Sequence, residues 1–478
     1  MKKSCLLSLF ILVFSLMLSA CNTADLEPTT TPIPSGTASP VPTQAEMLIE
    51  TPMPTPVPLS DEGPWLVFTD DAMENAKIFG VNADGTGKIL LLEGRFLNQV
   101  AGSPTGDLLA AIVYSDEKLS PKLLLIKLPE GEIVREVFLL SFYEDQPESF
   151  DDGPTGPGGG IYGDFQWSPD GRYLAFMGAI EGPNSSLYIY DSNEDVIKRL
   201  SENEYQAVAP VWSPDGQRII FQDVINFHGL SISGMWIASI EDAESELIYD
   251  STECYAEQIM GWVGNDSFVV EHGGGISRKE ICFVDLETGN VQVLFPDPFL
   301  FGVVDKKSGA VAVFPHTNVP NSTFDLEMGI YLVSPEITTP KLIRSTDQFS
   351  RFSWYEEKGL FISNIECETD PTQAMVFNSS GEKICVTKQK DSYSYISPDE
   401  QYYLDRDSEW IIYKANGDKL GAVSEIIDGL GWSLDSKGFF INSDETIFYI
   451  SVPEMVLYEV HQSQKGYYDF TWVGAPQD

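Results

Sequence analysis

Short apolar stretches separated by tight polar turns recur along residues 61–478. The two clearest copies run from Phe165 to Phe176 and from Val211 to Phe221, and each reads as a strand, a Trp-Ser-Pro-Asp-Gly turn and a second strand. β-Branched and aromatic residues follow the turn, as in Ile219-Ile220-Phe221, which is typical of a buried strand. The pattern predicts an all-β domain with many turns and few long helices.

The residues of the turn explain its geometry. Proline presets φ near −65° at the first corner, aspartate accepts hydrogen bonds from nearby backbone N–H groups, and glycine adopts the left-handed conformation. Successive turns are 36 to 65 residues apart, a period found in propellers and solenoids. Weaker and degenerate copies contain Gly102–Gly106, Ile396–Glu400, Trp432–Asp435, Gly261–Gly264, Val304–Lys307 and Ser353–Glu356.

Each repeat is predicted to form a four-stranded antiparallel meander, because a second polar turn follows its third strand. Examples of this later turn are Asp191–Glu194, Leu286–Gly289 and Ala415–Asp418. A single sheet of this kind leaves its edges exposed, and stacking several sheets radially around an axis protects them. The fold class predicted for residues 61–478 is therefore an all-β β-propeller.

The Trp-Ser-Pro-Asp-Gly copies at Trp167–Gly171 and Trp212–Gly216 resemble the repeats of TolB-type β-propellers, which also occur in the propellers of prolyl oligopeptidase-like enzymes. The resemblance covers most of residues 64–478, with two complete copies of the motif. It implies the architecture, and it suggests by analogy a scaffold role in cell-envelope protein assemblies. Architecture alone does not specify function.

The two ends of the repeat region complete one unit together. Pro64–Phe68 reads as a second strand without a first, and Tyr468–Trp472 reads as a first strand without a second. The N- and C-terminal strands are therefore predicted to close the ring. Eight internal turns plus this closure give nine blades, whereas propellers typically have four to eight. We therefore predict about eight blades, with a range of seven to nine.

The N-terminal residues predict a secreted lipoprotein. Lys2 and Lys3 precede an apolar run from Leu6 to Leu18 that is too short to span a bilayer. The following Leu18-Ser19-Ala20-Cys21 resembles the bacterial lipobox, which implies cleavage before Cys21 and attachment of a diacylglycerol to its thiol. The alternative is an ordinary signal peptide with an incidental cysteine. Residues 1–20 are thus assigned to the signal peptide and Cys21 to an anchor in the cell membrane or envelope.

A disordered tether is predicted to follow the anchor as far as residue 60. Residues 22–60 contain nine prolines and eight threonines, and no aromatic residue, lysine or arginine. Such a segment cannot bury enough apolar surface to fold. Where it is polyproline-like it extends about 3 Å per residue, so it could hold the folded domain, residues 61–478, clear of a membrane.

Four cysteines remain once Cys5 leaves with the signal peptide and Cys21 is lipidated. An even number in an oxidising compartment predicts two disulfides. Three pairings are open, of which the local one, Cys254–Cys282 with Cys367–Cys385, closes the shortest loops. The alternative is four buried free thiols. No spacing of cysteines and histidines indicates a zinc site.

Charge excludes one class of partner. Asp and Glu total 72 against 29 Lys and Arg, a formal net charge of −43. This excess repels phosphate, so the sequence predicts no nucleic-acid partner. With 43% hydrophobic and 12% aromatic residues, the chain can nevertheless build a substantial core.

The long connections fall on one predicted face. In a four-stranded meander the first and third turns lie on one side, while the second turn and the crossing to the next sheet lie on the other. The first and third turns here are short. Because functional variation concentrates in loops on a rigid scaffold, we expect the other side, called here the second-turn face, to be a binding face. Its long connections are Phe142–Gly160, Asp223–Ser233, His272–Ser277, Pro315–Glu327 and Ile365–Gln373.

Histidines and acidic residues are the candidate ligand-binding groups on the second-turn face. Three of the four histidines occupy second turns or strand ends in consecutive repeats, and two of them follow the second strand at equivalent places. A metal or anion site is one interpretation, and scattered surface histidines are the alternative. Acidic loops could hold Ca²⁺, although none has EF-hand spacing; no other cofactor is expected. The candidate residues are His228, His272, His316, Asp145, Asp151, Asp152 and Asp325.

Motifs of the common enzyme classes are missing from the sequence. It contains no GxSxG nucleophile elbow, no GxxxxGK[ST] phosphate loop and no HExxH helix. Paired carboxylates are not diagnostic in a chain with 72 acidic residues. We therefore predict that the chain is not an enzyme.

Three functions remain as hypotheses. The first is a lipid-anchored module outside the cytoplasm that binds or scaffolds an envelope protein, peptide or glycan through the second-turn face. The second is an envelope glycan hydrolase or lyase that uses loop carboxylates. The third is a lipoprotein that captures a solute for a transporter, although such proteins usually have two α/β lobes.

Overall fold

The computed structural model describes most of the repeat region. The chain divides into the units Met1–Met47 and Leu48–Asp478, and every described residue belongs to the second unit. The described residues are 58–70, 76–94, 97–114, 121–139, 165–181, 185–201, 206–226, 231–250, 256–273, 279–316, 322–345, 352–355, 360–367, 370–387, 395–399, 401–406, 410–423, 428–443, 445–463 and 470–474.

The described elements are all β-strands, and they pair into nine four-stranded antiparallel sheets. Within this part of the chain, no helix is long and apolar enough to cross a membrane. The first five sheets contain β3(Ile89–Gly94), β2(Ala76–Asn82), β1(Trp65–Asp70) and β36(Phe470–Val473); β4(Leu97–Gly102), β5(Leu108–Tyr114), β6(Pro121–Lys127) and β7(Glu132–Phe138); β8(Gln166–Trp167), β9(Tyr173–Gly178), β10(Ser186–Asp191) and β11(Val196–Arg199); β12(Gln206–Trp212), β13(Arg218–Asn226), β14(Ser231–Ser239) and β15(Ser245–Asp250); β16(Ala256–Val263), β17(Ser267–Gly273), β18(Lys279–Asp285) and β19(Asn290–Phe295).

The remaining four sheets repeat the same order of strands. They contain β20(Phe299–Val304), β21(Val311–Pro315), β22(Gly329–Ser334) and β23(Ile337–Ser345); β24(Phe352–Tyr355), β25(Leu360–Cys367), β26(Asp370–Asn378) and β27(Lys383–Thr387); β28(Tyr395–Ile396), β29(Tyr402–Arg406), β30(Trp410–Lys414) and β31(Lys419–Val423); β32(Asp428–Trp432), β33(Gly438–Ser443), β34(Thr446–Ser451) and β35(Leu457–Gln462).

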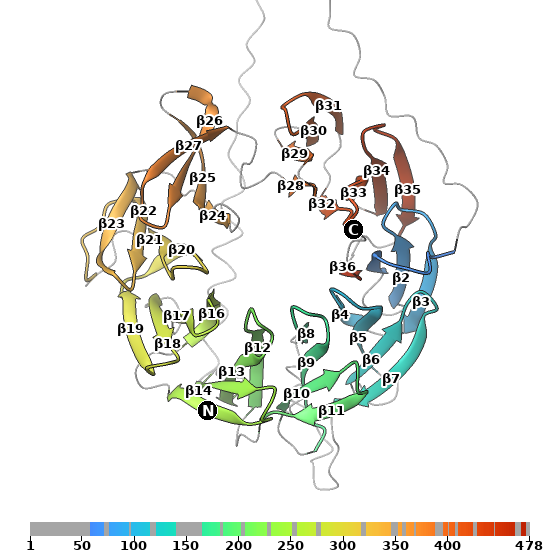
Figure 1. Cartoon of the computed structure of the whole chain (residues 1–478), viewed down its shortest axis with the longest axis horizontal. Helices are drawn as coiled ribbons and strands as arrows, with labels where there is room; N and C mark the ends of the chain where they lie inside the picture. The colour runs from blue at the N-terminus through green and yellow to red at the C-terminus, as the bar shows by residue number, and fades with distance from the viewer. Residues whose placement is uncertain are drawn as a thin grey trace, which may run out of the picture. The chain divides into compact units, whose positions relative to one another are not determined.

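The sheets follow one another around a common centre, with first strands such as β8, β12 and β16 on the inside and last strands such as β7 and β19 on the outside (Figure 1). The described residues form eight buried apolar clusters, and each cluster joins side chains of two consecutive sheets. This arrangement confirms the predicted β-propeller.

The number of blades differs from the preferred prediction. Nine sheets are present among the described residues, whereas about eight were predicted. Nine lies within the predicted range, and it equals the direct count of turns plus closure. The preferred value was too low because nine blades are rare and one degenerate unit was therefore discounted, whereas the unit of β24 and β25, which lacks the Pro-Asp-Gly turn, still forms a complete sheet.

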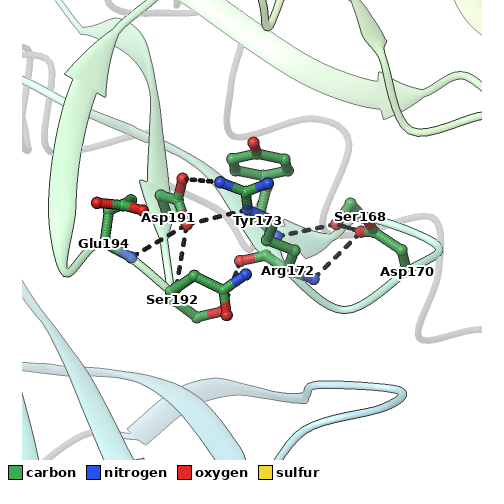
Figure 2. A network of polar contacts seen from close by, with 8 residues as sticks. Ser168, Asp170, Arg172, Tyr173, Asp191, Ser192 and Glu194 are labelled. Atoms are coloured by element: carbon green, nitrogen blue, oxygen red, sulfur yellow. Dashed lines mark hydrogen bonds and ion pairs between the residues drawn. The ribbon is translucent and has the colours of Figure 1, made fainter.

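Serine and aspartate hold the repeated turn together. The Ser168 side chain is buried, its hydroxyl donates to Asp170, and it accepts the Tyr173 N–H at 2.9 Å (Figure 2). The Asp170 carboxylate in turn accepts the Arg172 N–H at 3.1 Å. Because the side chains replace backbone partners, the chain reverses within five residues. The same pair of bonds recurs at Ser213–Arg218, Ser397–Tyr402 and Ser433–Gly438.

Tryptophans of the repeat connect neighbouring sheets. The indole N–H of Trp167 donates to the Ala101 carbonyl oxygen at 3.0 Å, and that of Trp212 donates to the Gln166 carbonyl oxygen at 2.9 Å. Both acceptors lie on the first strand of the preceding sheet, β4 and β8. A buried tryptophan therefore supplies both apolar surface and a directional hydrogen bond between blades.

The ring closes where prediction placed the closure. β36 pairs with β1 through four residues, from Trp65↔Val473 to Phe68↔Phe470. The Gly474 N–H also donates to the Ser103 carbonyl oxygen at 2.9 Å, which ties the C-terminal strand to the next sheet. The packed domain begins slightly before residue 61, because Leu59 is buried in the apolar cluster that joins these two sheets.

Two glycines of the repeat allow a matched test of the turn. Gly171 (φ +72°) and Gly216 (φ +67°) both adopt the left-handed conformation, so alanine at either position is expected to cost about 1–2 kcal/mol. A Cβ at Gly171 would also lie 2.3 Å from Thr105 Oγ1, whereas at Gly216 the nearest atom is 3.5 Å away.

Gly171→Ala is therefore expected to lower the urea midpoint of unfolding clearly more than Gly216→Ala. Equal losses in the two variants would mean that the close contact of Gly171 with Thr105, between the third and second sheets, does not add to the cost of the alanine.

Candidate functional site

The best described part of the second-turn face is the loop between β21 and β22. A buried aspartate outside this loop holds it in place. Asp297, between β19 and β20, accepts the Thr323 N–H at 2.6 Å, the Phe324 N–H at 2.8 Å and the Ser322 hydroxyl at 2.9 Å. Three donors to one buried carboxylate fix the backbone of the loop.

Aromatic packing adds to this anchor. The Phe324 ring stacks on Phe295 with centroids 6.4 Å apart and an interplanar angle of 24°. The Tyr331 hydroxyl donates to the Glu327 carbonyl oxygen at 3.0 Å, and the His316 N–H donates to the Pro298 carbonyl oxygen at 2.8 Å. Both ends and the middle of the described loop are therefore fixed to the sheet.

Exposed and partly buried side chains alternate along the loop. Thr323, Asp325 and Glu327 are exposed, whereas the intervening Phe324 and Leu326 are partly buried and pack against the core of the sheet. The exposed set presents a hydroxyl and two carboxylates on a restrained backbone. Such a row can accept hydrogen bonds from hydroxyl, amide or cationic groups of a ligand.

The predicted histidines are only partly placed. His272 lies in β17, opposite Ala256 and Glu280 in the register, and its side chain lies outside the described residues. His316 follows β21 and is exposed. The two residues thus stand at corresponding ends of second strands in consecutive sheets. His228 lies outside the described residues, so a three-histidine site stays a prediction.

The acidic candidates are likewise divided. Asp325 is exposed in the anchored loop, while Asp145, Asp151 and Asp152 lie outside the described residues. Among the side chains that the structure describes, no group of three or more His, Cys, Asp or Glu residues is placed to hold a metal ion. A Ca²⁺ site in the acidic loops therefore stays a prediction.

One of the predicted disulfide cysteines is described fully. Cys282 is buried in β18 and is disulfide-bonded. Its predicted partner, Cys254, lies outside the described residues. Cys367 lies at the end of β25 and Cys385 in β27, so a bond between them would have to span β26. The pairings stay predictions, and Cys21 lies outside the described residues.

Sequence reasoning missed a polar cluster at the closure of the ring, in which His461 and Ser463 are buried, Asp70 is partly buried and Lys88 is exposed. The cluster, called here the seam cluster, consists of Asp70, Lys88, His461 and Ser463. The His461 ring, 7% exposed, has Nε2 2.8 Å from Asp70 Oδ2 and Nδ1 3.2 Å from Lys88 Nζ. The Ser463 hydroxyl donates to the other oxygen of Asp70, and Lys88 also donates to the Val460 carbonyl oxygen at 3.0 Å.

The bonding pattern assigns the proton of the neutral His461 ring. An ammonium group can only donate, so the Nδ1 atom that faces Lys88 accepts, and Nε2 carries the proton that it donates to Asp70. Phe68 and Phe79 flank the ring at centroid distances of 5.3 and 4.7 Å. The Ser463 hydroxyl donates to Asp70, which is not the bond from serine to histidine that activates a serine nucleophile.

Burial is the main influence on the pKa values of the seam cluster. Burial lowers the pKa of His461, and the positive charges of Lys88 and Lys77 lower it further, while the hydrogen bond to Asp70 raises it. Burial also lowers the pKa of Lys88, against the attraction of Glu459 and Asp70. The neutral histidine is therefore the favoured form near neutral pH.

Comparison with known proteins gives short or distant matches. No family model matches the chain. The uncharacterized peptidase YuxL of Bacillus subtilis is 42% identical over 57 residues, which is 12% of this chain and 9% of that protein. The chain spans less than half the length of the curated relatives that it matches.

Two solved structures illustrate the structural likeness. TolB from Acinetobacter baumannii is 16% identical, with 59% of this chain and 66% of that chain covered and a TM-score of 0.30. Dipeptidyl peptidase 4 of Porphyromonas gingivalis is 13% identical, with coverages of 77% and 59% and a TM-score of 0.45. Likeness at this level does not bear on activity, and the propeller is defined by the sheets of the chain itself.

The prediction that the chain is not an enzyme is wrong. It was drawn from missing motifs alone. A segment 42% identical to this chain belongs to a protein named as a peptidase. A peptidase can therefore contain a segment of this sequence type, and motifs missing from residues 1–478 do not exclude an enzymatic role.

Proposed function

We propose that the chain is a propeller module held outside the cytoplasm by a lipid on Cys21, which binds an envelope protein, peptide or glycan at its second-turn face. The observation that carries the proposal is the anchored loop: a buried carboxylate, Asp297, fixes a segment whose exposed residues are polar. A surface ordered before binding loses less conformational entropy when a ligand arrives.

The exposed groups indicate the chemistry of the ligand. Asp325 and Glu327 offer two carboxylates, and Thr323 adds a hydroxyl on the same side of the loop. Lysine or arginine side chains of a peptide, or the hydroxyls of a glycan, are complementary to such a row. The net charge of −43 favours the approach of a cationic partner.

Crosslinking in producing cells, followed by purification from the membrane fraction, tests this proposal. The wild-type chain is expected to retain specific partners that the double variant Asp325→Asn/Glu327→Gln loses by at least about tenfold, which is 1.4 kcal/mol. The matched control is Glu241→Gln/Glu244→Gln, in the exposed turn between β14 and β15 on the opposite face. Equal loss in both variants, or retention in both, would reject the loop as the binding site.

Fractionation of the same cells tests the lipid anchor separately. A Cys21→Ser chain is expected to leave the membrane fraction while its domain keeps the fold of the wild type. Continued membrane association of this variant would reject the anchor without affecting the binding face.

An envelope enzyme acting on a peptide or glycan is the second candidate, and the relative named as a peptidase favours it. Its test is turnover of peptide and glycan pools by the purified chain. Activity that disappears in Asp325→Asn while ligand binding remains would support the enzyme over the binding module. A lipoprotein that captures a solute would instead show a higher melting temperature with a small molecule.

A further inference from the structure

The seam cluster joins parts of the chain that lie 391 residues apart, since Asp70 ends β1 and His461 lies in β35. We propose that this cluster is an acid-sensitive latch, which ties β35 to β1 at neutral pH and releases the closing sheet when His461 is protonated. The latch acts beside β36, the four-residue strand that closes the ring.

Neutral His461 satisfies both neighbours at once. Nε2–H donates to Asp70 and Nδ1 accepts from Lys88. Protonation places a second N–H opposite the ammonium group at 3.2 Å, so a hydrogen bond becomes a contact between two like charges. The ring is 7% exposed, so water reaches this contact only from the side of Lys88, which is exposed.

The charged groups around His461 come from β1, β2, its own strand β35 and the turn before β3. Asp70 on β1 favours the protonated ring, whereas Lys77 on β2 and Lys88 before β3 oppose it. Glu459 on β35 acts on Lys88. Lys77 is itself 3.9 Å from Glu93 on β3, which reduces its influence on the ring. Burial of the ring and the two nearest charges, Asp70 and Lys88, therefore decide the response.

The direction of the pH response follows from the lowered pKa of His461 in the folded chain. In the unfolded chain the ring titrates near 6.5. Above that pH both states are neutral and the contribution of the latch is complete. As pH falls below about 6.5, the unfolded or locally opened state takes up the proton first, and the closing sheet loses stability.

Hydrogen exchange measured by mass spectrometry at pH 7.5 and 5.5 tests the latch. Peptides from β9 in the same sample correct for the intrinsic effect of pH on exchange. Protection of β1, β35 and β36 is expected to fall relative to β9 by up to about tenfold, the most that one histidine can contribute over the one unit below 6.5. His461→Gln, whose amide can donate to Asp70 and accept from Lys88, should keep its protection.

His316→Gln is the matched control, because it removes an exposed histidine far along the chain from the seam cluster, and it should retain the wild-type response. An equal loss of protection in wild type and His461→Gln, or no relative loss in wild type, would overturn the proposal. If His461→Gln does not fold, Lys88→Gln takes its place: without the ammonium group, the protonated ring meets no like charge at Nδ1, and the response should weaken. An unchanged response in Lys88→Gln would also overturn the latch.

Discussion

Gly102→Ala is expected to disrupt closure of the ring and to cost about 3 kcal/mol or more of folding stability. A Cβ on Gly102 would lie 1.9 Å from the carbonyl oxygen of Trp472 and 2.6 Å from its carbonyl carbon. These are backbone atoms of β36 and cannot rotate away, so β4 and β36 must separate. The Gly102 N–H would then lose its bond to Thr471 Oγ1, now 2.9 Å long. Urea unfolding followed by circular dichroism measures the loss.

Gly261→Ala provides the control for this variant. Gly261 occupies β16, a first strand like β4, and a Cβ there would meet nothing closer than 3.9 Å. Alanine in a strand is favoured over glycine by roughly 0.5–1 kcal/mol, so this variant should be neutral or slightly more stable. A Gly102→Ala chain as stable as Gly261→Ala would show that the approach of β4 to β36 is not needed for closure.

The fold could be predicted because local chemistry determines the repeated turn. Serine, aspartate and glycine close the turn within five residues, so each copy indicates two strands without any knowledge of the rest of the chain. Closure could be predicted because the first and last strands each lacked a partner. Degenerate units were harder to count, since β24 and β25 belong to a complete sheet although the sequence between them has no Pro-Asp-Gly turn.

The candidate site could be predicted only in part, because its decisive contacts are not local. Loop length and the polar residue Asp325 pointed to the second-turn face, but Asp297 stands between two prolines and reads as a turn residue. Its role as the anchor of Thr323 and Phe324 depends on how β19 and β20 bring it beneath the loop. The seam cluster depends even more on the fold, since Asp70, the acidic partner of His461, lies 391 residues before it in the sequence.

Removal of residues 470–478 is expected to have the largest effect, on the order of 5 kcal/mol. The described part of this segment contains β36, in which Val473 is fully buried and Phe470 and Trp472 are partly buried. Its loss exposes one edge of β1, whose Trp65, Leu66, Val67 and Phe68 are all buried. An unpaired apolar edge strand promotes association between chains. Static light scattering and thermal unfolding should therefore show aggregation and a markedly lower midpoint.

A synthetic peptide of residues 464–474 separates loss of closure from general damage. If β36 acts by pairing with β1, the peptide should restore the thermal midpoint of the shortened chain and suppress its aggregation, because the four backbone pairs from Trp65↔Val473 to Phe68↔Phe470 can form again. A peptide of the same composition in scrambled order cannot reproduce the register and should not rescue. A chain shortened only after Gly474 keeps all of these pairs and should unfold like wild type. Rescue by both peptides, or a stable monomer without β36, would mean that closure of the ring does not depend on this strand.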